Sequence, residues 1–144
     1  MKVITAIAIF LFIFSVCKED INGPALLTHY EQWLSFNIHN YKIEQVRTCF
    51  CINGGERMDI TVLADTVFSV VRISDETVIP YPASKHYLTI DSLFRTIQNH
   101  LSDSLVVTYD PQYGYPSKLD INPQLHPVDG GQLFQTSNLQ VINE

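Results

Sequence analysis

Cys49 and Cys51 are the residues of this sequence that could carry redox chemistry. They lie in YKIEQVRTCFCI (41–52), a stretch rich in β-branched and aromatic side chains, which predicts a strand. On a strand, residues two apart face the same side with Cα atoms about 6.6 Å apart, close to the upper limit of about 6.8 Å for a disulfide. A bridge therefore requires a bend or bulge, and so short a ring stabilises a fold by only about 1.5 kcal/mol in the chain-entropy model.

A structural disulfide and a redox-active pair are the two interpretations of these cysteines. Strained bridges are the easily reduced ones, which favours redox chemistry. No helix is predicted to follow the pair and lower a thiol pKa, and Arg47 is the cation close to it in sequence, so we favour the structural interpretation. Zinc is not expected, because no further Cys or His stands at finger-like spacing.

A second candidate is the tyrosine-rich turn YDPQYGYP at 109–116. Pro111 presets a turn, and Gly114 permits a positive φ. Three amphipathic rings gather at this hairpin end, and tyrosine combines contact area with a hydrogen-bonding tip. The preferred alternative is that the rings cap the core and hold the turn. The candidate binding turn consists of Tyr109, Asp110, Tyr113, Gly114 and Tyr115.

Three carboxylates, Asp110, Asp120 and Asp129, could converge at one end of the predicted sheet, with His126 nearby. Clustered carboxylates and carbonyls are the ligands that Ca²⁺ takes. The spacing matches no known calcium loop, and Asp before Pro is also a common turn former. A calcium site is thus an alternative that the spacing does not favour, and the sequence predicts no bound metal and no cofactor.

Motifs of enzyme classes are missing from the sequence. It contains no Gly-x-Ser-x-Gly, Walker loop or His-Glu-x-x-His, and its five histidines are scattered. The sequence therefore favours a protein that is not an enzyme. Its net charge of −6 argues against binding to nucleic acid and against electrostatic adhesion to anionic lipid.

The elements that must position these residues alternate between helical and extended patterns. ALLTHYEQWLSF predicts a helix with Pro24 in its first turn, and a second helix is predicted to begin after Thr89, which serves as N-cap, and to reach Leu101. The six predicted strands are YKIEQVRTCFCI, MDITVLA and VFSVVRI joined around Asp65-Thr66, SLVVTYD, YPSKLDIN and QLFQTSNLQVIN.

Each half of the chain thus reads as one helix followed by three strands. We interpret this as an α-β-β-β unit used twice; the alternative is that the likeness reflects generic strand-turn-strand chemistry. Two helices with one apolar face each would cover one face of an antiparallel sheet. The expected fold is α+β in two layers, with about six antiparallel strands covered on one face by two helices.

The N-terminal segment has the pattern of an export signal. Lys2 precedes the apolar run VITAIAIFLFIFSV, whose 14 residues are fewer than the approximately 20 that a membrane-spanning helix needs. The expected organisation is a signal peptide at 1–16, a tether at 17–23 and a single α+β domain at 24–144.

Cys17 ends this run and is the expected site of lipid attachment. The stretch F-S-V-C resembles a lipobox, although Val16 is bulkier than the usual residue before the cysteine. The Lys-Glu-Asp that follows resembles the signal that sends some bacterial lipoproteins to the outer cell surface. The alternative is ordinary cleavage after Cys17, which would give a soluble periplasmic or secreted domain. Either route leaves Cys49 and Cys51 as an even pair.

Three stretches together resemble a bacterial family catalogued as a domain of unknown function, numbered 6174. They are NYKIEQVRTCFC (40–51), LTIDSLFRTI (88–97) and VVTYDPQYGYPSKLDIN (106–122). The resemblance runs from about Trp33 to the C-terminus and implies an exported, often lipid-anchored envelope protein, with no established catalytic or binding residues. One departure is the turn after the second strand, where the family usually has Asp-Gly and this chain has Asp65-Thr66.

Three hypotheses for function follow. The first is a non-enzymatic envelope lipoprotein, a small binding or accessory module whose partner is an envelope protein or ligand that the sequence does not identify. The second is a thiol–disulfide enzyme using Cys49 and Cys51. The third is a calcium-dependent structural module using Asp110, Asp120 and Asp129. The oligomeric state is not indicated by the sequence.

Overall fold

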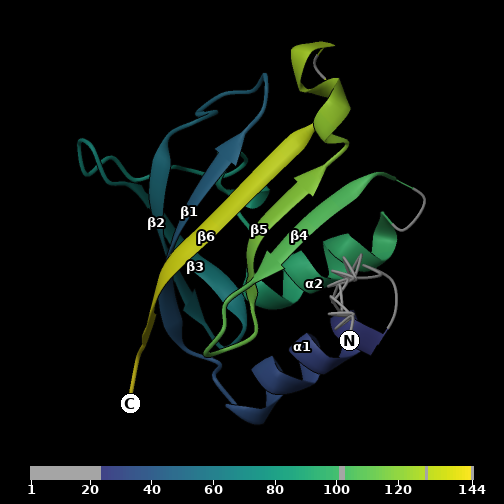
Figure 1. Ribbon diagram of the computed structural model, residues 1–144. Helices are drawn as coiled ribbons and strands as arrows, with labels where there is room; N and C mark the ends of the chain where they lie inside the picture. Colours follow the sequence, from purple (N-terminus) through teal and green to yellow (C-terminus); the bar gives the residue numbers. More distant parts are fainter. Residues whose placement is uncertain (1–23, 101–102, 129, 144) are drawn as a thin grey trace, which may run out of the picture.

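Six strands form one open antiparallel sheet in the order β3-β2-β1-β6-β5-β4 (Figure 1). This computed structural model describes residues 24–100, 103–128 and 130–143. The expected signal peptide (1–16), the tether with Cys17, the end of the second helix at Leu101, and Asp129 lie outside the described residues. Within the described ranges, no helix has the length and apolar character needed to cross a membrane.

The helices and strands stand where the sequence predicts them. Two short 3-10 turns, η1 and η2, lie in segments predicted as loops, and β1 ends earlier than predicted because the chain bends after Thr48. The elements are α1 (Pro24–Ser35), β1 (Tyr41–Thr48), β2 (Arg57–Leu63), β3 (Thr66–Arg72), η1 (Ala83–His86), α2 (Ile90–Asn99), β4 (Leu105–Tyr109), β5 (Pro116–Ile121), η2 (Pro123–Val128) and β6 (Gln132–Val141).

One face of the sheet carries the core, because alternate residues of each strand point to the same side. On β1 these are Tyr41, Ile43, Gln45 and Arg47, all buried. α1 reaches this face through Trp33, whose ring meets Tyr41 edge-on at 5.7 Å. α2 reaches it at its first residue, whose backbone N–H donates to Tyr41 Oη at 2.9 Å. Both helices therefore cover the same face, and the α+β prediction is confirmed.

The duplicated α-β-β-β unit is not confirmed. Neighbouring strands are antiparallel throughout, including the central pair β1 and β6. Compare the two halves from the side of the helices, each turned so that its first strand, β1 or β4, points up. The strands that follow β1 then lie on one side of it, and those that follow β4 lie on the other. No rotation superimposes halves of opposite hand, so the structure does not repeat one unit.

The turn between β2 and β3 is placed one residue earlier than the sequence suggests. Its central residues are Ala64 and Asp65, with φ of 47° and 61°, the left-handed pair that a two-residue hairpin needs. Asn40 Oδ1 accepts a hydrogen bond from the Ala64 N–H at 2.8 Å, and the Asp65 N–H donates to the His39 carbonyl at 3.1 Å. The loop before β1 thus holds this turn in place.

Candidate functional site

The bend that follows β1 is closed by a disulfide between Cys49 and Cys51, whose Cα atoms are 5.3 Å apart. This confirms the expectation that a bridge at this spacing interrupts the strand. The Cys51 N–H donates a hydrogen bond to the Cys49 carbonyl at 2.9 Å, and the Gly55 N–H donates one to the Arg47 carbonyl at 2.8 Å. Residues 49–55 thus form a tight loop, called here the Cys loop.

The Cys loop is braced against the rest of the molecule and carries two exposed apolar side chains. Arg72 donates through Nη2 to Asn53 Oδ1 at 2.9 Å, and Gly54 lies so close to the Cys49 carbonyl that a side chain would not fit. Phe50 is 73% exposed and Ile52 82% exposed. Two large apolar side chains exposed on one braced loop make this loop a candidate contact surface.

A groove of about 620 Å³ runs beside the Cys loop and is called here the disulfide groove. Its other walls are the segment from Pro82 to His86 and the backbone at 130–132, which leads into β6. Arg47 and Lys85 bring positive charge to the groove, and the described lining residues include no carboxylate. The sequence alone did not indicate this site.

Arg47 lines the groove and is only 9% exposed. Its guanidinium carbon is 5.9 Å from the centroid of the Tyr87 ring, and among the described residues it has no hydrogen-bond or ion-pair partner. Partial burial, and then the charges of Arg47 and Lys85, lower the pKa of His86. The positive charge of this region therefore comes from Arg47 and Lys85, beside a histidine whose neutral form is favoured.

The tyrosine-rich turn is packed against α1. Gln32 Nε2 donates to the Gln112 carbonyl at 3.0 Å, and Asp110 Oδ1 accepts from the Tyr113 N–H at 2.7 Å. The three tyrosine rings pair with aromatic side chains of α1 and of the residue just after it: His29 with Tyr109 at 4.0 Å, Trp33 with Tyr115 at 6.5 Å and Phe36 with Tyr113 at 5.0 Å between ring centroids.

Burial is deepest at Tyr115, where desolvation and then the nearby Asp110 carboxylate raise the pKa of the phenol to about 12. Gly114 has φ of 79°, and the turn approaches α1 so closely there that a Cβ would lie 2.7 Å from the His29 carbonyl. The turn thus has the packing role that was the preferred interpretation. Its binding role stays a prediction.

Comparison with known proteins identifies the family but no relative of known function. A model described as a family of unknown function (DUF6174) matches residues 25–141. The chain belongs to DUF6174. No curated protein and no solved structure matches it significantly. What this DUF6174 member binds must therefore be argued from its own surface.

The carboxylates proposed for calcium are not brought together in this DUF6174 domain. Asp110 precedes β5 and Asp120 lies near its far end, about 16 Å along the strand, so the expected convergence of these two is wrong. Asp120 is instead buried beside His126, with Nε2 at 2.7 Å, and beside Lys118, with Nζ at 3.6 Å. Within the described residues, no group of three metal-binding side chains is present.

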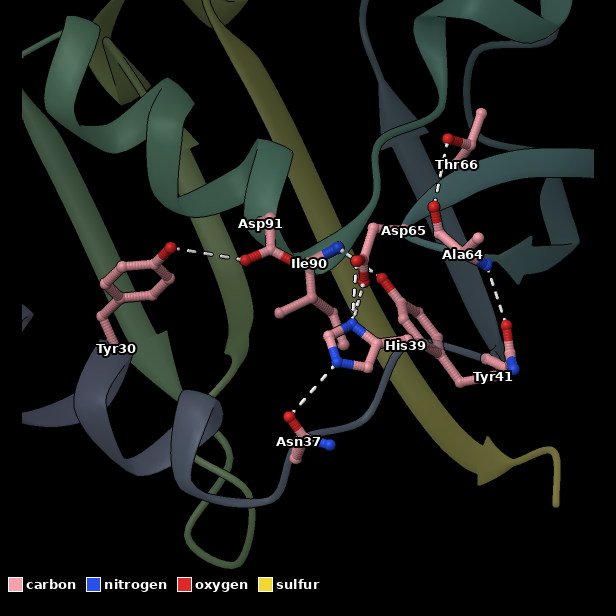
Figure 2. A network of polar contacts seen from close by, with 10 residues as sticks. Tyr30, Asn37, His39, Tyr41, Ala64, Asp65, Thr66, Ile90 and Asp91 are labelled. Carbon is pink, nitrogen blue, oxygen red and sulfur yellow. Dashed lines mark hydrogen bonds and ion pairs between the residues drawn. The ribbon is translucent and has the colours of Figure 1, made fainter.

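A second hollow of the DUF6174 domain, of about 480 Å³, lies between α1, α2 and the β2–β3 turn. Figure 2 shows its polar network, in which His39 Nδ1 is 2.8 Å from Asp65 Oδ2. The other ring nitrogen is 3.3 Å from Asn37 Oδ1. Both ring nitrogens thus face neighbours in the loop and turn, so His39 joins these two segments instead of activating a nucleophile.

Proposed function

We propose that this protein is a non-enzymatic module of the bacterial cell envelope that binds a partner protein through the Cys loop and the disulfide groove. The observation that carries the proposal is the exposure of Phe50 and Ile52 on a braced loop beside a positively charged groove. Interface energy is concentrated in a few large side chains with surrounding polar groups, and this surface offers that combination.

The absence of a reaction is supported by the roles of the polar groups. The histidine–carboxylate pairs of the described chain brace local structure: His39 with Asp65 joins a loop to a turn, and His126 with Asp120 joins η2 to β5. Cys49 and Cys51 form the loop that carries the contact residues. A structural role for the bridge agrees with a binding module better than with a redox enzyme.

Export and lipid attachment are the second part of the proposal. Support comes from the apolar run that ends at Cys17 and from the charged residues after it. We expect the intact mass of the protein purified from membranes to correspond to a chain that begins at Cys17 and carries acyl groups. A mass that begins at Lys18 without lipid would make the domain soluble and would remove the anchor from the proposal.

Binding at the Cys loop is tested by photo-cross-linking in cells. A photoreactive amino acid at Ile52 is expected to give a discrete adduct with one partner protein, because this side chain projects from the braced loop. The same group at Val106, exposed on the opposite face of the sheet, serves as the control and should give no such adduct. The companion change Phe50→Ser should remove the adduct at Ile52 without changing the melting temperature.

Identical adducts from both positions, or none from Ile52, would place the contact surface elsewhere. An adduct that survives Phe50→Ser would show that the apolar tip of the loop does not contribute to binding. In either case the proposed role of the Cys loop would be wrong.

A further inference from the structure

We propose that the disulfide groove binds a carboxylate held by Arg47, and that this carboxylate belongs to an apolar segment of the partner polypeptide. The inference rests on the proposed function, since it names the chemistry of the partner. Arg47, which is largely buried, and the exposed side chains of Phe50 and Ile52 line the same groove. A ligand that satisfies both must carry an anionic group beside apolar side chains.

The first step of the argument is the state of the Arg47 guanidinium. An arginine has five N–H donors in a planar fork, and donors without a protein partner are available to a ligand that enters the groove. Arg47 is 9% exposed, its guanidinium lies over the Tyr87 ring, and among the described residues it has no ion-pair partner. By contrast, Lys42, Arg57, Arg72 and Lys118 each lie within 4 Å of a carboxylate oxygen. Arg47 is thus a donor group that lines the groove and whose acceptor would come from outside the described chain.

The second step is the charge around it. Lys85 and His86 line the same groove, and no described lining residue is acidic, although the whole chain has a net charge of −6. A positive concavity on an acidic protein attracts anions locally while the rest of the surface repels them. The planar fork of arginine matches a carboxylate by two parallel hydrogen bonds. The groove therefore selects a carboxylate.

The third step concerns the rest of the ligand. Apart from the disulfide itself, the apolar lining consists of Phe50, Ile52, Pro82 and Ala83. Phe50 and Ile52 are largely exposed, so they form an open apolar edge and do not enclose a ligand. A free fatty acid would leave its acyl chain in water here. Apolar side chains on either side of a carboxylate can cover Phe50 and Ile52 from outside, which is the contact that a polypeptide makes.

The experiment is a titration of the ¹⁵N-labelled protein, purified from membranes into lipid nanodiscs and followed by NMR at the Arg47 Nε–H signal. The probes are two acetylated, amidated tripeptides, phenylalanine–aspartate–phenylalanine and phenylalanine–asparagine–phenylalanine. The aspartate peptide is expected to bind about tenfold more tightly, because only it supplies an anionic acceptor. Equal affinity for the two peptides, or tighter binding of dodecanoate than of the aspartate peptide, would overturn the inference.

Matched variants locate the effect. Arg47→Met keeps the side-chain stem and should abolish the preference for the aspartate peptide, whereas Arg57→Met, at an exposed arginine paired with Glu44, should preserve it. If Arg47→Met fails to fold, Lys85→Glu provides the test on the surface of the groove. This change should weaken binding of the aspartate peptide and leave the affinity for the asparagine peptide unchanged. Unaltered preference in Lys85→Glu would contradict the site.

Failure of this inference can be told apart from failure of the proposed function. Equal binding of the two tripeptides with a specific adduct at Ile52 would overturn the carboxylate and leave the Cys loop as the binding surface. A clear preference for aspartate without any adduct at Ile52 would support the groove as a carboxylate site and overturn the Cys loop as the surface that contacts the partner.

Discussion

Replacing Gln45 by alanine is expected to lower the free energy of unfolding by about 4 kcal/mol. The side chain is fully buried in the centre of the core face. Its Oε1 accepts from the Leu88 N–H at 3.0 Å, while Nε2 donates to the Leu88 carbonyl and to Thr136 Oγ1, both at 3.3 Å. Gln45→Ala leaves these buried groups unpaired and opens a cavity. Urea unfolding followed by circular dichroism measures the loss.

The matched control for this prediction is Gln135→Ala. Gln135 is exposed on the opposite face of the sheet, so its removal should change the free energy of unfolding by no more than about 0.5 kcal/mol. A similar small change in Gln45→Ala would show that Gln45 does not support the segment before α2.

Replacing Gly114 by alanine is expected to lower the free energy of unfolding by about 3 kcal/mol. Two effects combine at this position. Its φ of 79° is unfavourable for alanine, and the added Cβ would lie 2.7 Å from the His29 carbonyl and 2.9 Å from Gln32 Oε1. The carbonyl belongs to the backbone of α1 and cannot move without displacing the helix. Thermal and urea unfolding both report the change.

Gly55→Ala separates these two effects. Gly55 has nearly the same φ, 82°, but no atom lies within 4 Å of the Cβ position. Only the conformational term applies, so the loss should be about 1 kcal/mol. Equal losses in Gly55→Ala and Gly114→Ala would mean that the tyrosine turn is not pressed against α1.

Local patterns predicted most of the fold because they coincide with the final contacts. The spacing of Ile90, Leu93, Phe94 and Ile97 predicts the buried face of α2, and the Thr89 hydroxyl caps it by accepting from the Ser92 N–H at 3.1 Å. The pattern failed where another constraint was stronger. The residues after Thr48 have strand propensity, but the disulfide and Gly54 impose a bend.

The candidate site was only partly predictable. The cysteine pair stood out by its spacing, whereas the disulfide groove depends on residues that approach only in three dimensions. Arg47 lies on β1 and Lys85 on η1, and nothing in the sequence around either indicates that they share a groove. The expected convergence of Asp110 and Asp120 at a calcium site failed for a related reason, since these two residues lie at opposite ends of β5.

The pairing of β1 with β6 has a consequence for how the chain folds. The ladder joins Tyr41 to Val141 and Arg47 to Phe134, so the centre of the sheet is built from its first and last strands. Contacts so distant in sequence slow folding, because a long loop must close before they form. Until β6 is available, the strands can form only two separate units, the three-stranded meander β1-β2-β3 and the hairpin β4-β5. The inner edge of each unit, at β1 and at β5, then has no partner strand. The domain therefore stays incompletely folded until its last strand has been made, and any shortening of the chain that removes β6 should leave both inner strand edges unpaired.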